Sequence, residues 1–343
     1  MTETSTRPST SARRSHQPRR RRTLSGITPS GSLTLGNYLG ALGRFASGQD
    51  DVEGFYFVAD LHALTTEHEP ATTRRLVDET AALFYAVGLD PERSTVFIQS
   101  QVPAHVELAY LLESTAYVGE LGRMIQFKDK GGRPKTRASL FTYPCLMAAD
   151  ILLYDTESVP VGGDQDQHVE LSRDLAVRFN RSYGETFVIP ELARSAVAAR
   201  VTDLSDPTVK MSKSAAPDAA GVVRMRDTPD VIRRKVARAV TDSESVVRYA
   251  PAEKPGVSNL LDILASLEDS TPDALAADYT SYGALKAACS ERIIETLRPV
   301  QRRYDELDTD PQMLQALLDR GAERARAVSG PVLARARNAI GLT

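Results

Sequence analysis

Short apolar runs typical of buried strands alternate with amphipathic helical segments through the first two hundred residues, and this alternation is the feature that most constrains the fold. The runs are short and rich in β-branched or aromatic residues, whereas the segments between them carry apolar residues three and four apart. Strands that alternate with helices build a parallel sheet with helices on both faces. We therefore predict an α/β fold with a Rossmann-like, doubly wound parallel sheet. The predicted strands are 24–27, 55–59, 95–98 and 158–161, and the predicted helices are 33–42, 71–87, 144–154 and one from 164 to 179.

The later part of the chain has helical patterns alone, and no strong strand pattern follows residue 201 or so. Between the two parts, residues 200–215 have the composition of a loop, with Asp206, Pro207 and several lysines and serines. We predict an α/β domain over 23–203 and a helical domain over 204–343. The predicted helices of the second domain are 229–240, 258–267, 282–306, 310–327 and 331–340.

The first 22 residues form a basic tail with seven arginines, one glutamate and almost no apolar residues. Such a segment cannot bury a core, so we expect it to be disordered. Its arginine run 19–22 could contact RNA phosphates, but the alternative that we prefer is a dispensable leader or a misassigned start codon. No apolar segment follows the arginines, which argues against a secretory signal.

Composition excludes several classes of protein. No apolar run approaches the roughly 20 residues that span a bilayer. The two cysteines, Cys145 and Cys289, can supply neither a disulfide framework nor a four-ligand zinc site. We therefore expect no membrane segment, no protein-bound metal site and a reducing, cytoplasmic setting.

The first motif that carries chemistry is the turn 28–31 between the strand at 24–27 and the next helix. A strand-to-helix turn directs free backbone N–H groups and the positive end of the helix toward one point. Glycines such as Gly31, Gly36 and Gly40 let a nucleotide approach the backbone closely. The spacing matches neither the dinucleotide fingerprint nor a P-loop, so tight strand–helix packing is an equally good explanation.

The second motif is Lys210-Met211-Ser212-Lys213-Ser214, in the loop after Pro207. Mobile lysines suit a phosphoryl group that gains charge only as the reaction proceeds. Loops of lysine and serine are common on protein surfaces, but this string is highly specific. It matches the KMSKS signature of class I aminoacyl-tRNA synthetases at every position.

Further stretches resemble the bacterial tryptophanyl-tRNA synthetases within that class. Thr34-Leu35-Gly36-Asn37 stands where the family carries its HIGH signature. Residues 99–105, 142–154 and 159–168 also resemble the family. The resemblance runs in order from about residue 24 to about residue 330 and leaves out only the tail.

This resemblance implies a tryptophan pocket around Asp150. An unpaired carboxylate in an apolar helix would be costly, and a donor-only indole N–H is a suitable partner for it. Met147, one turn earlier, would add a soft wall for the ring. The alternatives are a satisfied structural carboxylate and an ordinary core methionine. The resemblance adds Tyr143, Val161 and Leu24 to the same pocket, and His62 and Gln165 as contacts for the amino or carboxylate group.

The resemblance also implies an ATP site. The first group of contacts would come from Thr28, Pro29, Ser30, Gly36 and Asn37. The second would come from Gly162, Gly163 and Asp164, of which Asp164 would bind the ribose hydroxyls. The backbone of Val201 would contact the adenine. The signature loop would contribute Lys210, Met211, Ser212, Lys213 and Ser214. The catalytic residues implied are Lys210, Lys213, Asn37 and Lys130, although Lys130 is equally well explained as a lysine on a charged loop.

The implied reaction needs no covalent enzyme intermediate. The carboxylate of L-tryptophan attacks the α-phosphorus of ATP, with Mg²⁺, and a hydroxyl of the terminal adenosine of tRNA(Trp) then attacks the adenylate. Catalysis is positioning and charge stabilisation. The helical domain would contact the anticodon, and the family is homodimeric with each active site inside one Rossmann domain.

Two alternatives differ in function. A tyrosine–tRNA ligase would share fold and signatures but needs partners for a phenol hydroxyl, which Met147 and Asp150 do not suggest. A non-catalytic paralogue with a binding or regulatory role would explain why Thr28 stands where many bacterial relatives have glutamine. Those relatives also have phenylalanine at the position of Leu24. We expect these two departures to change the response to indole-like inhibitors while tryptophan activity is retained.

Overall fold

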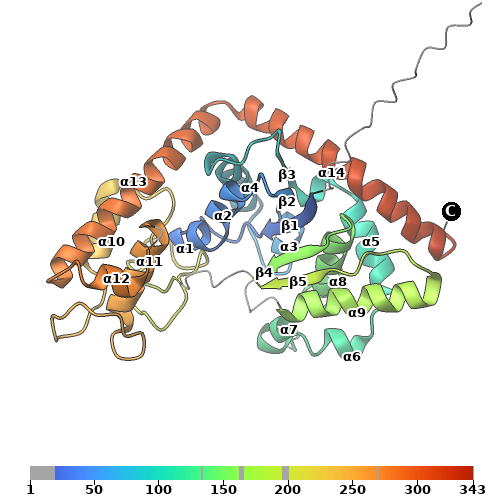
Figure 1. Ribbon diagram of the computed structural model, residues 1–343. Coiled ribbons are helices and arrows are strands. Elements are labelled where there is room, and N and C mark those ends of the chain that lie inside the picture. Colours follow the sequence, from blue (N-terminus) through green and yellow to red (C-terminus); the bar gives the residue numbers. More distant parts are fainter. Residues whose placement is uncertain (1–19, 133, 162–165, 195–200, 269, 343) are drawn as a thin grey trace, which may run out of the picture.

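Five parallel strands form the centre of the protein (Figure 1). The computed structural model describes residues 20–342 except 133, 162–165, 195–200 and 269, so most of the expected tail lies outside it. The strand order is β3-β2-β1-β4-β5 and every pair is parallel, which confirms the predicted α/β fold. The strands are β1 (Arg21–Ile27), β2 (Val52–Val58), β3 (Ser94–Ile98), β4 (Ser158–Val161) and β5 (Glu191–Arg194).

The second strand, β2, shows why these runs are apolar at nearly every position. Phe55 and Phe57 pack into the hydrophobic core on one face of the sheet, whereas Tyr56 and Val58 pack into the core on the other. Successive side chains of a strand point to opposite faces, so a strand covered on both sides is apolar throughout. The sheet is therefore buried between two helical layers.

The fifth strand, β5, is absent from the prediction. It pairs only with β4, as the edge strand of the sheet, and its sequence Glu-Leu-Ala-Arg has no β-branched residue. Pairing with a neighbour, rather than local preference, places such a segment in a sheet.

The helix predicted over 33–42 is a composite. It begins as α1 (Leu35–Asn37), continues as the π-helical turn η1 (Tyr38–Leu42) and ends as α2 (Gly43–Ser47). Single π-helical turns inside helices are rare and frequently occur at functional sites. Here the π-helical turn directly follows Gly36 and Asn37, which were predicted to contact the nucleotide.

The remaining helices of the first part cover the two faces of the sheet (Figure 1). One of them, α8, was predicted to begin at Pro144 but begins five residues earlier and continues through that proline. Pro144 lies inside the helix, where it removes the hydrogen bond to the carbonyl of Leu140, yet the helix continues to Leu152. The helices are α3 (Asp60–Ala63), α4 (Pro70–Ala86), α5 (Ala104–Glu113), α6 (Val118–Leu121), α7 (Ile125–Lys130), α8 (Ser139–Leu152) and α9 (Asp166–Tyr183), with a 3₁₀ turn η2 (Gln99–Gln101) after β3.

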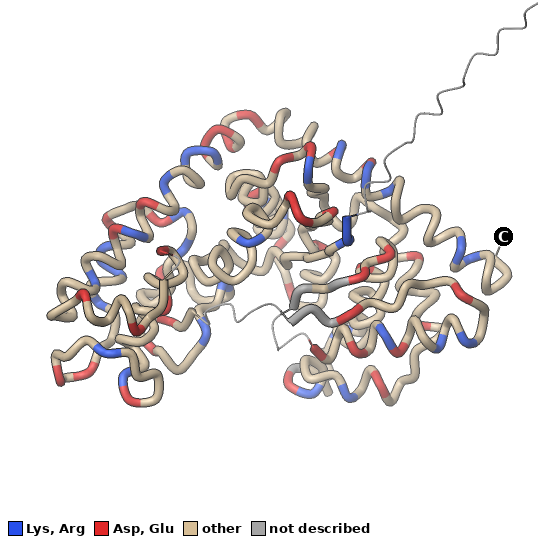
Figure 2. Tube along the Cα trace, in the orientation of Figure 1, with Lys and Arg blue, Asp and Glu red and all other residues tan. Residues whose placement is uncertain are grey.

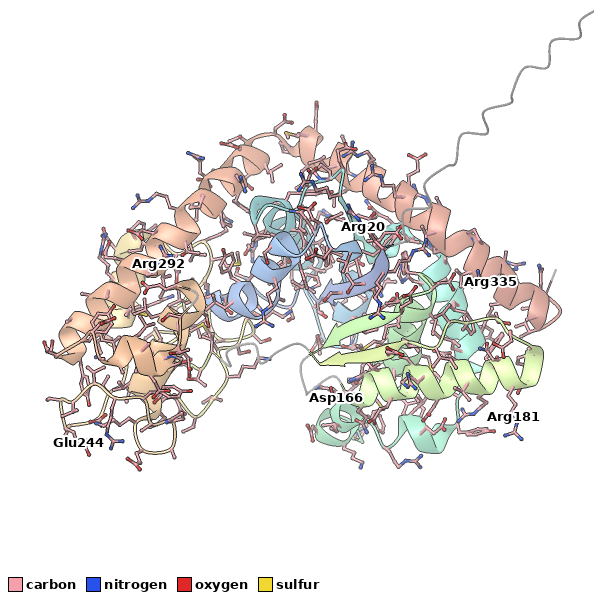
Figure 3. The ribbon with its side chains drawn as sticks, in the orientation of Figure 1. Arg20, Asp166, Arg181, Glu244, Arg292 and Arg335 are labelled. Carbon is pink, nitrogen blue, oxygen red and sulfur yellow. The ribbon has the colours of Figure 1, made fainter. Side chains whose placement is uncertain are left out.

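The second part is helical over its described residues. It contains α10 (Pro229–Ala237), α11 (Pro255–Glu268), α12 (Pro272–Ala276), α13 (Tyr282–Thr309) and α14 (Pro311–Ala339). Figure 3 shows Glu244 on the loop at the outer end of this part and Asp166 where α9 begins in the other. Acidic and basic residues are mixed along α13, whereas the charged residues of α14 after Glu323 are all arginines (Figure 2).

The last helix, α14, does not stay with the other late helices. It bends away from α13 and runs back over the sheet (Figure 1), where it packs on β3 and α5. The prediction of two helices broken near Pro331 was wrong, because α14 passes through that proline without ending. Contact is closest at Gly321, where a Cβ would lie 1.7 Å from the carbonyl oxygen of Val96.

No helix in the described part of the chain is long and apolar enough to cross a membrane. Cys145 and Cys289 are both free and buried.

Candidate active site

The signature loop closes onto the turn that follows β1. The ammonium group of Lys213 donates a hydrogen bond to the carbonyl oxygen of Thr28 at 2.5 Å. Gly31 lies so close to the loop that a Cβ there would be 2.0 Å from the carbonyl oxygen of Lys213. The structure therefore brings together the two motifs that the sequence analysis assigned to ATP.

Gly36 extends this junction. A Cβ on Gly36 would lie 3.6 Å from Val201 Cβ and 3.7 Å from Met211 Cβ, at ordinary contact distance. The backbone N–H of Met211 donates to the carbonyl of Val201 at 3.1 Å. Three separate segments with residues predicted to bind ATP thus meet at the start of α1.

The signature loop is anchored by contacts on its buried side. Met211 is only 4% exposed and packs in the hydrophobic core, so its side chain acts as the anchor of the loop. The amide of Asn259, on α11, bonds both backbone groups of Thr202, at 2.9 and 3.1 Å. By contrast, Lys210, Ser212 and Ser214 are exposed, so the anchored loop presents polar side chains outward.

Arg224 secures the end of the loop. Its guanidinium donates to the carbonyl oxygens of Ala215 and Ala216, at 2.9 and 2.8 Å, and to that of Ser32 at 3.3 Å. Because one planar group spans both segments, Arg224 fixes the loop relative to the turn after β1. The sequence analysis did not identify this residue, since an isolated arginine carries no local signal.

Asn37 has a structural role beside the predicted nucleotide contact. Its side-chain oxygen accepts from the backbone N–H of Thr34 at 3.0 Å, and the Thr34 hydroxyl accepts from the N–H of Asn37 at 3.3 Å. This reciprocal capping box begins α1. Only the amide nitrogen of Asn37 is left for a ligand.

A second group of polar side chains gathers where neighbouring strands end. Thr28 follows β1, His62 lies in α3 directly after β2, and Gln99 begins the turn after β3. In parallel sheets ligands bind at this edge, beyond the carboxyl ends of the strands. The order of the strands therefore places His62 and Gln99 beside the turn that carries Thr28.

Asp150, on α8, is the centre of this group. Its side chain is buried, and its Oδ1 accepts from Gln99 Nε2 at 2.7 Å and from His105 Nδ1 at 2.6 Å. Its Oδ2 accepts from His62 Nε2 at 2.8 Å. Burial raises the pKa of Asp150, but the hydrogen bonds from His105 and His62 outweigh it and hold the pKa below its usual value. Asp150 is therefore an ionised, buried acceptor.

The number of donors at Asp150 limits what else it can bind. A carboxylate offers about four lone-pair positions, two on each oxygen. Two donors occupy Oδ1 and one occupies Oδ2. The remaining position, on Oδ2 beside His62, suits one additional donor.

Two side chains one and two turns before Asp150 line the approach to it. Met147 and Tyr143 are both half-buried, and Met147 packs on the hydrophobic core. The Tyr143 hydroxyl lies 2.6 Å from His168 Nε2, and its ring meets that of His62 edge-on. Burial raises the pKa of Tyr143 to about 12, so the hydroxyl stays protonated and donates to His168.

The other predicted residues are placed differently. Leu24 is buried in the core of the sheet. Pro29 is buried and Ser30 is exposed on the turn after β1. Val161 and Lys130 end β4 and α7, and Gly162, Gly163, Asp164 and Gln165 lie outside the described residues.

Gln99 and His105 are the contacts that the sequence analysis missed. Both lie in the stretch 99–105, which was noted only for its resemblance. The signal was available in Asp150 itself, because a carboxylate in an apolar helix requires buried donors from elsewhere. What the sequence could not show is which donors the fold would bring there.

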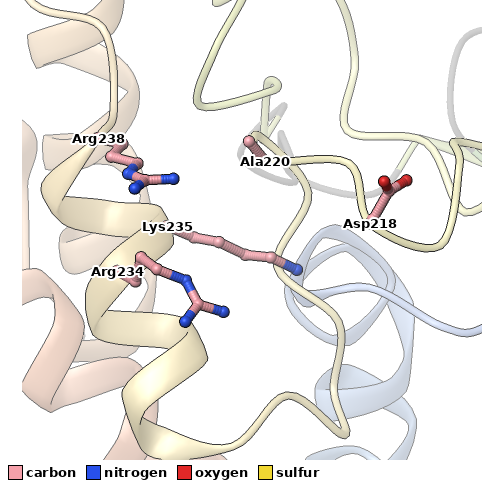
Figure 4. A pocket seen from close by; sticks show the side chains of 5 residues that line it. All are labelled: Asp218, Ala220, Arg234, Lys235 and Arg238. Carbon is pink, nitrogen blue, oxygen red and sulfur yellow. The ribbon is translucent and has the colours of Figure 1, made fainter.

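A small basic cavity lies behind the signature loop. Arg234 and Lys235 of α10, and Arg238 directly after it, line the cavity opposite Asp218 and Ala220 (Figure 4). Lys235 is paired with Asp227 at 2.7 Å, whereas Arg234 and Arg238 are exposed and lie one turn apart. Among the described residues no group of three or more His, Cys, Asp or Glu could hold a metal ion.

Comparisons with known proteins point to one family. A family profile described as "tRNA synthetases class I (W and Y)" matches residues 17–298. The chain is 53% identical over 327 residues to "Tryptophan--tRNA ligase 1" of Streptomyces coelicolor, covering 94% of this chain and 97% of that one. It is 46% identical over 321 residues to "Tryptophan--tRNA ligase" of Bacillus subtilis, covering 93% and 97%.

Solved structures give the same result. The tryptophanyl-tRNA synthetase of Mycoplasma pneumoniae superposes with a TM-score of 0.86 at 35% identity, covering 94% of this chain and 98% of that one. That of Campylobacter jejuni, solved as a complex with ADP and tryptophan, has a TM-score of 0.80 at 32% identity and coverages of 94% and 100%.

Proposed function

The chain belongs to the class I tRNA synthetases of the W and Y group, and we propose that it joins tryptophan to tRNA(Trp) at the expense of ATP. Tryptophan and ATP form tryptophanyl-adenylate and pyrophosphate, and the tryptophanyl group then passes to the tRNA. The reaction takes place in the cytoplasm, whose reducing conditions suit two free cysteines.

The observation that supports tryptophan as the amino acid is the acceptor capacity of Asp150. Its carboxylate is ionised, buried and filled on three sides by donors, and one position on Oδ2 stays open beside His62. An indole carries a single N–H donor and no acceptor, which fits that position. Met147 and Tyr143 would flank the ring, with Val161 and the buried Leu24 behind it and Gln165 at the amino acid backbone.

The ATP part of the proposal rests on the junction between the signature loop and α1. We assign Thr28, Pro29, Ser30, Gly36 and Asn37, the backbone of Val201 and the loop 210–214 to ATP, with Gly162, Gly163 and Asp164 as the second contact. Lys210, Lys213 and Lys130 would balance charge on the phosphates, with Asn37 nearby. Mg²⁺ enters as part of MgATP.

Two exchange assays test the proposed function. Pyrophosphate exchange into ATP should depend on tryptophan, and tyrosine should support it at least about 10³-fold less efficiently, the order expected when buried polar groups are left unpaired. Exchange with tyrosine alone would make the chain a tyrosine–tRNA ligase. Exchange with neither amino acid would indicate a non-catalytic relative.

A pH dependence follows from Lys213. Burial, and secondly the charge of Lys210, lower the pKa of Lys213 to about 8. A lysine is charged below its pKa, so kcat/KM for ATP should fall as pH rises through about 8. The pH profile should be measured at saturating tryptophan. Lys213→Arg should abolish this limb and Lys210→Ala should move it to higher pH; an identical limb in both variants would exclude Lys213 as its origin.

The departures at Thr28 and Leu24 should alter inhibition more than activity. Thr28 is half-buried beside Lys213 and too short to replace glutamine, so Thr28→Gln is the cleaner test. We expect it to change the inhibition constant of an indole-like inhibitor by about tenfold, which is the effect of one hydrogen bond. The KM for tryptophan should change less. Leu24→Phe adds volume to a buried site, so its thermal stability must be measured alongside. Unchanged constants in both variants would refute this prediction.

We assign the tRNA contacts to the helical part, from residue 204 onward. Arg234 and Arg238 at the basic cavity favour this, because both are exposed and neither forms an ion pair within the described part of the chain. Arg234→Ala with Arg238→Ala should raise KM for tRNA roughly tenfold and reduce its salt dependence, because phosphate contacts release counterions. Exchange without tRNA should be unaffected. A control is Arg320→Ala, a half-buried arginine on α14 paired with Glu92. Equal effects of the two changes would rule out a specific contact.

A homodimer is also part of the proposal. Large exposed apolar side chains cluster in one stretch of the α/β part, where Val118, at 75%, and Tyr110, at 71%, are the most exposed and Val106, Tyr117 and Ile125 follow. Monomers rarely expose apolar surface on this scale, so we place the dimer contact on α5 and α6. Tyr110→Asp should shift sedimentation toward the monomer, and an unchanged dimer would move the contact elsewhere.

A further inference from the structure

A buried chain of hydrogen bonds leads from Asp150 away from the pocket. His105 Nδ1 lies 2.6 Å from Asp150 Oδ1, and His105 Nε2 lies 2.8 Å from the hydroxyl of Tyr154. Both His105 and Tyr154 are 0% exposed, so water does not replace either partner. Their rings pack on Phe97 of β3 at 5.8 Å between centroids, which holds them in place.

The chemistry of the three groups sets the direction of the protons. Burial, and secondly the charge of Asp150, raise the pKa of Tyr154 well above its usual value, so its hydroxyl keeps its proton. The ionised carboxylate of Asp150 can only accept, so His105 Nδ1 carries the hydrogen and donates to it. A neutral imidazole has one donor and one acceptor, so Nε2 accepts from the Tyr154 hydroxyl.

We propose that His105 and Tyr154 are positioning residues that determine the selectivity for tryptophan by locking the tautomer of His105. In this arrangement Oδ1 is occupied by His105 and Gln99, the carboxylate cannot rotate, and only Oδ2 faces the ligand. The inference rests on the proposed function, because it requires that Asp150 accept the indole N–H. Neither residue touches the substrate.

Loss of the Tyr154 hydroxyl has a specific consequence. It leaves His105 Nε2 without a donor in a buried site, and phenylalanine offers it no partner in either tautomer. The bond to Asp150 alone then holds the hydrogen on Nδ1 and the orientation of the ring. A ring that turns, or that carries its hydrogen on Nε2, no longer donates to Oδ1, and the carboxylate is then free to turn its open lone pair away from the pocket.

The test compares tryptophan with its benzothiophene analogue, in which sulfur replaces the indole N–H. We expect Tyr154→Phe and His105→Leu to lower the preference for tryptophan, as the ratio of kcat/KM values in pyrophosphate exchange, at least about tenfold, the scale of one bond to a charged group. The preference should fall because KM for tryptophan rises, while kcat/KM for the analogue stays nearly unchanged. His105→Asn, whose amide can replace Nδ1 as donor, should restore most of the preference.

Tyr56→Phe is the matched control, since Tyr56 is an equally buried tyrosine in the core on the other face of the sheet, and it should leave the ratio unchanged. Equal losses for both substrates would reduce His105 and Tyr154 to structural residues and overturn the inference, as would an unchanged ratio in Tyr154→Phe. Asp150→Asn distinguishes failure of the proposed contact between Asp150 and the indole from failure of the inference about His105 and Tyr154. An unchanged ratio there would refute the proposed contact itself, whereas a collapse in Asp150→Asn alone would refute only the inference.

Discussion

Asp150→Asn is expected to lower kcat/KM for tryptophan by about 10²- to 10³-fold, while KM for ATP changes less than about twofold. The substitution removes the charge from the only described carboxylate that His62, Gln99 and His105 all face. It also places an NH₂ group among three donors, so at least one buried donor loses its partner. Initial rates of pyrophosphate exchange over ranges of tryptophan and ATP measure both constants.

Asp155→Asn is the control for this prediction. Asp155 follows α8 closely and pairs with Arg335, labelled in Figure 3, at 2.6 Å. Its backbone has a φ of 47°, which asparagine adopts readily, so the fold should tolerate the change. We expect both constants to stay within about twofold. A large loss in Asp155→Asn, or an unchanged KM for tryptophan in Asp150→Asn, would contradict the assignment.

Lys213→Met should lower kcat for pyrophosphate exchange by about 10²- to 10³-fold and leave KM for tryptophan nearly unchanged. Methionine preserves the apolar stem in its half-buried position and removes only the charge. In the structure the ammonium is held by the carbonyl of Thr28, beside the proposed ATP site. It must leave that carbonyl to stabilise the charge that develops on the phosphates.

Lys286→Met provides a closely matched comparison. Lys286, on α13, also donates to backbone carbonyls, those of Ala237 and Ala239, and burial also lowers its pKa. Its printed partners lie at the end of α10 and not in the signature loop. Both variants therefore lose a similar bond, and only Lys213→Met should lose the rate. Similar rates in the two variants would exclude a transition-state role for Lys213.

Local pattern was sufficient for the elements with strong periodicity. The strands ending at Ile27, Val58 and Ile98 and the helix over 71–87 were predicted within a few residues of their observed bounds. These strands are buried on both faces and this helix is buried along one stripe, so the spacing of their apolar residues shows which positions face the core. The edge strand β5 and the unbroken α14 have no such local pattern, because contacts with segments distant in sequence determine their structure.

The site divides in the same way. Sequence alone predicted the turn at Thr28–Gly31, the lysines of 210–214 and the Met147–Asp150 pair, because each is a compact motif. Arg224, Asn259, Gln99 and His105 were not, since each acts through a contact with a segment far along the chain.

The sequence by itself determined the alternation of strands and helices, the family, and the residue types available for ATP and tryptophan. Tertiary structure alone decided that Lys213 rests on Thr28, that α14 returns to the sheet, and that three donors converge on Asp150. The physical reason is the distance along the chain over which each property is determined. Periodicity and signatures are properties of neighbouring residues, whereas a buried charge is satisfied by whichever donors the packed chain brings within hydrogen-bonding distance.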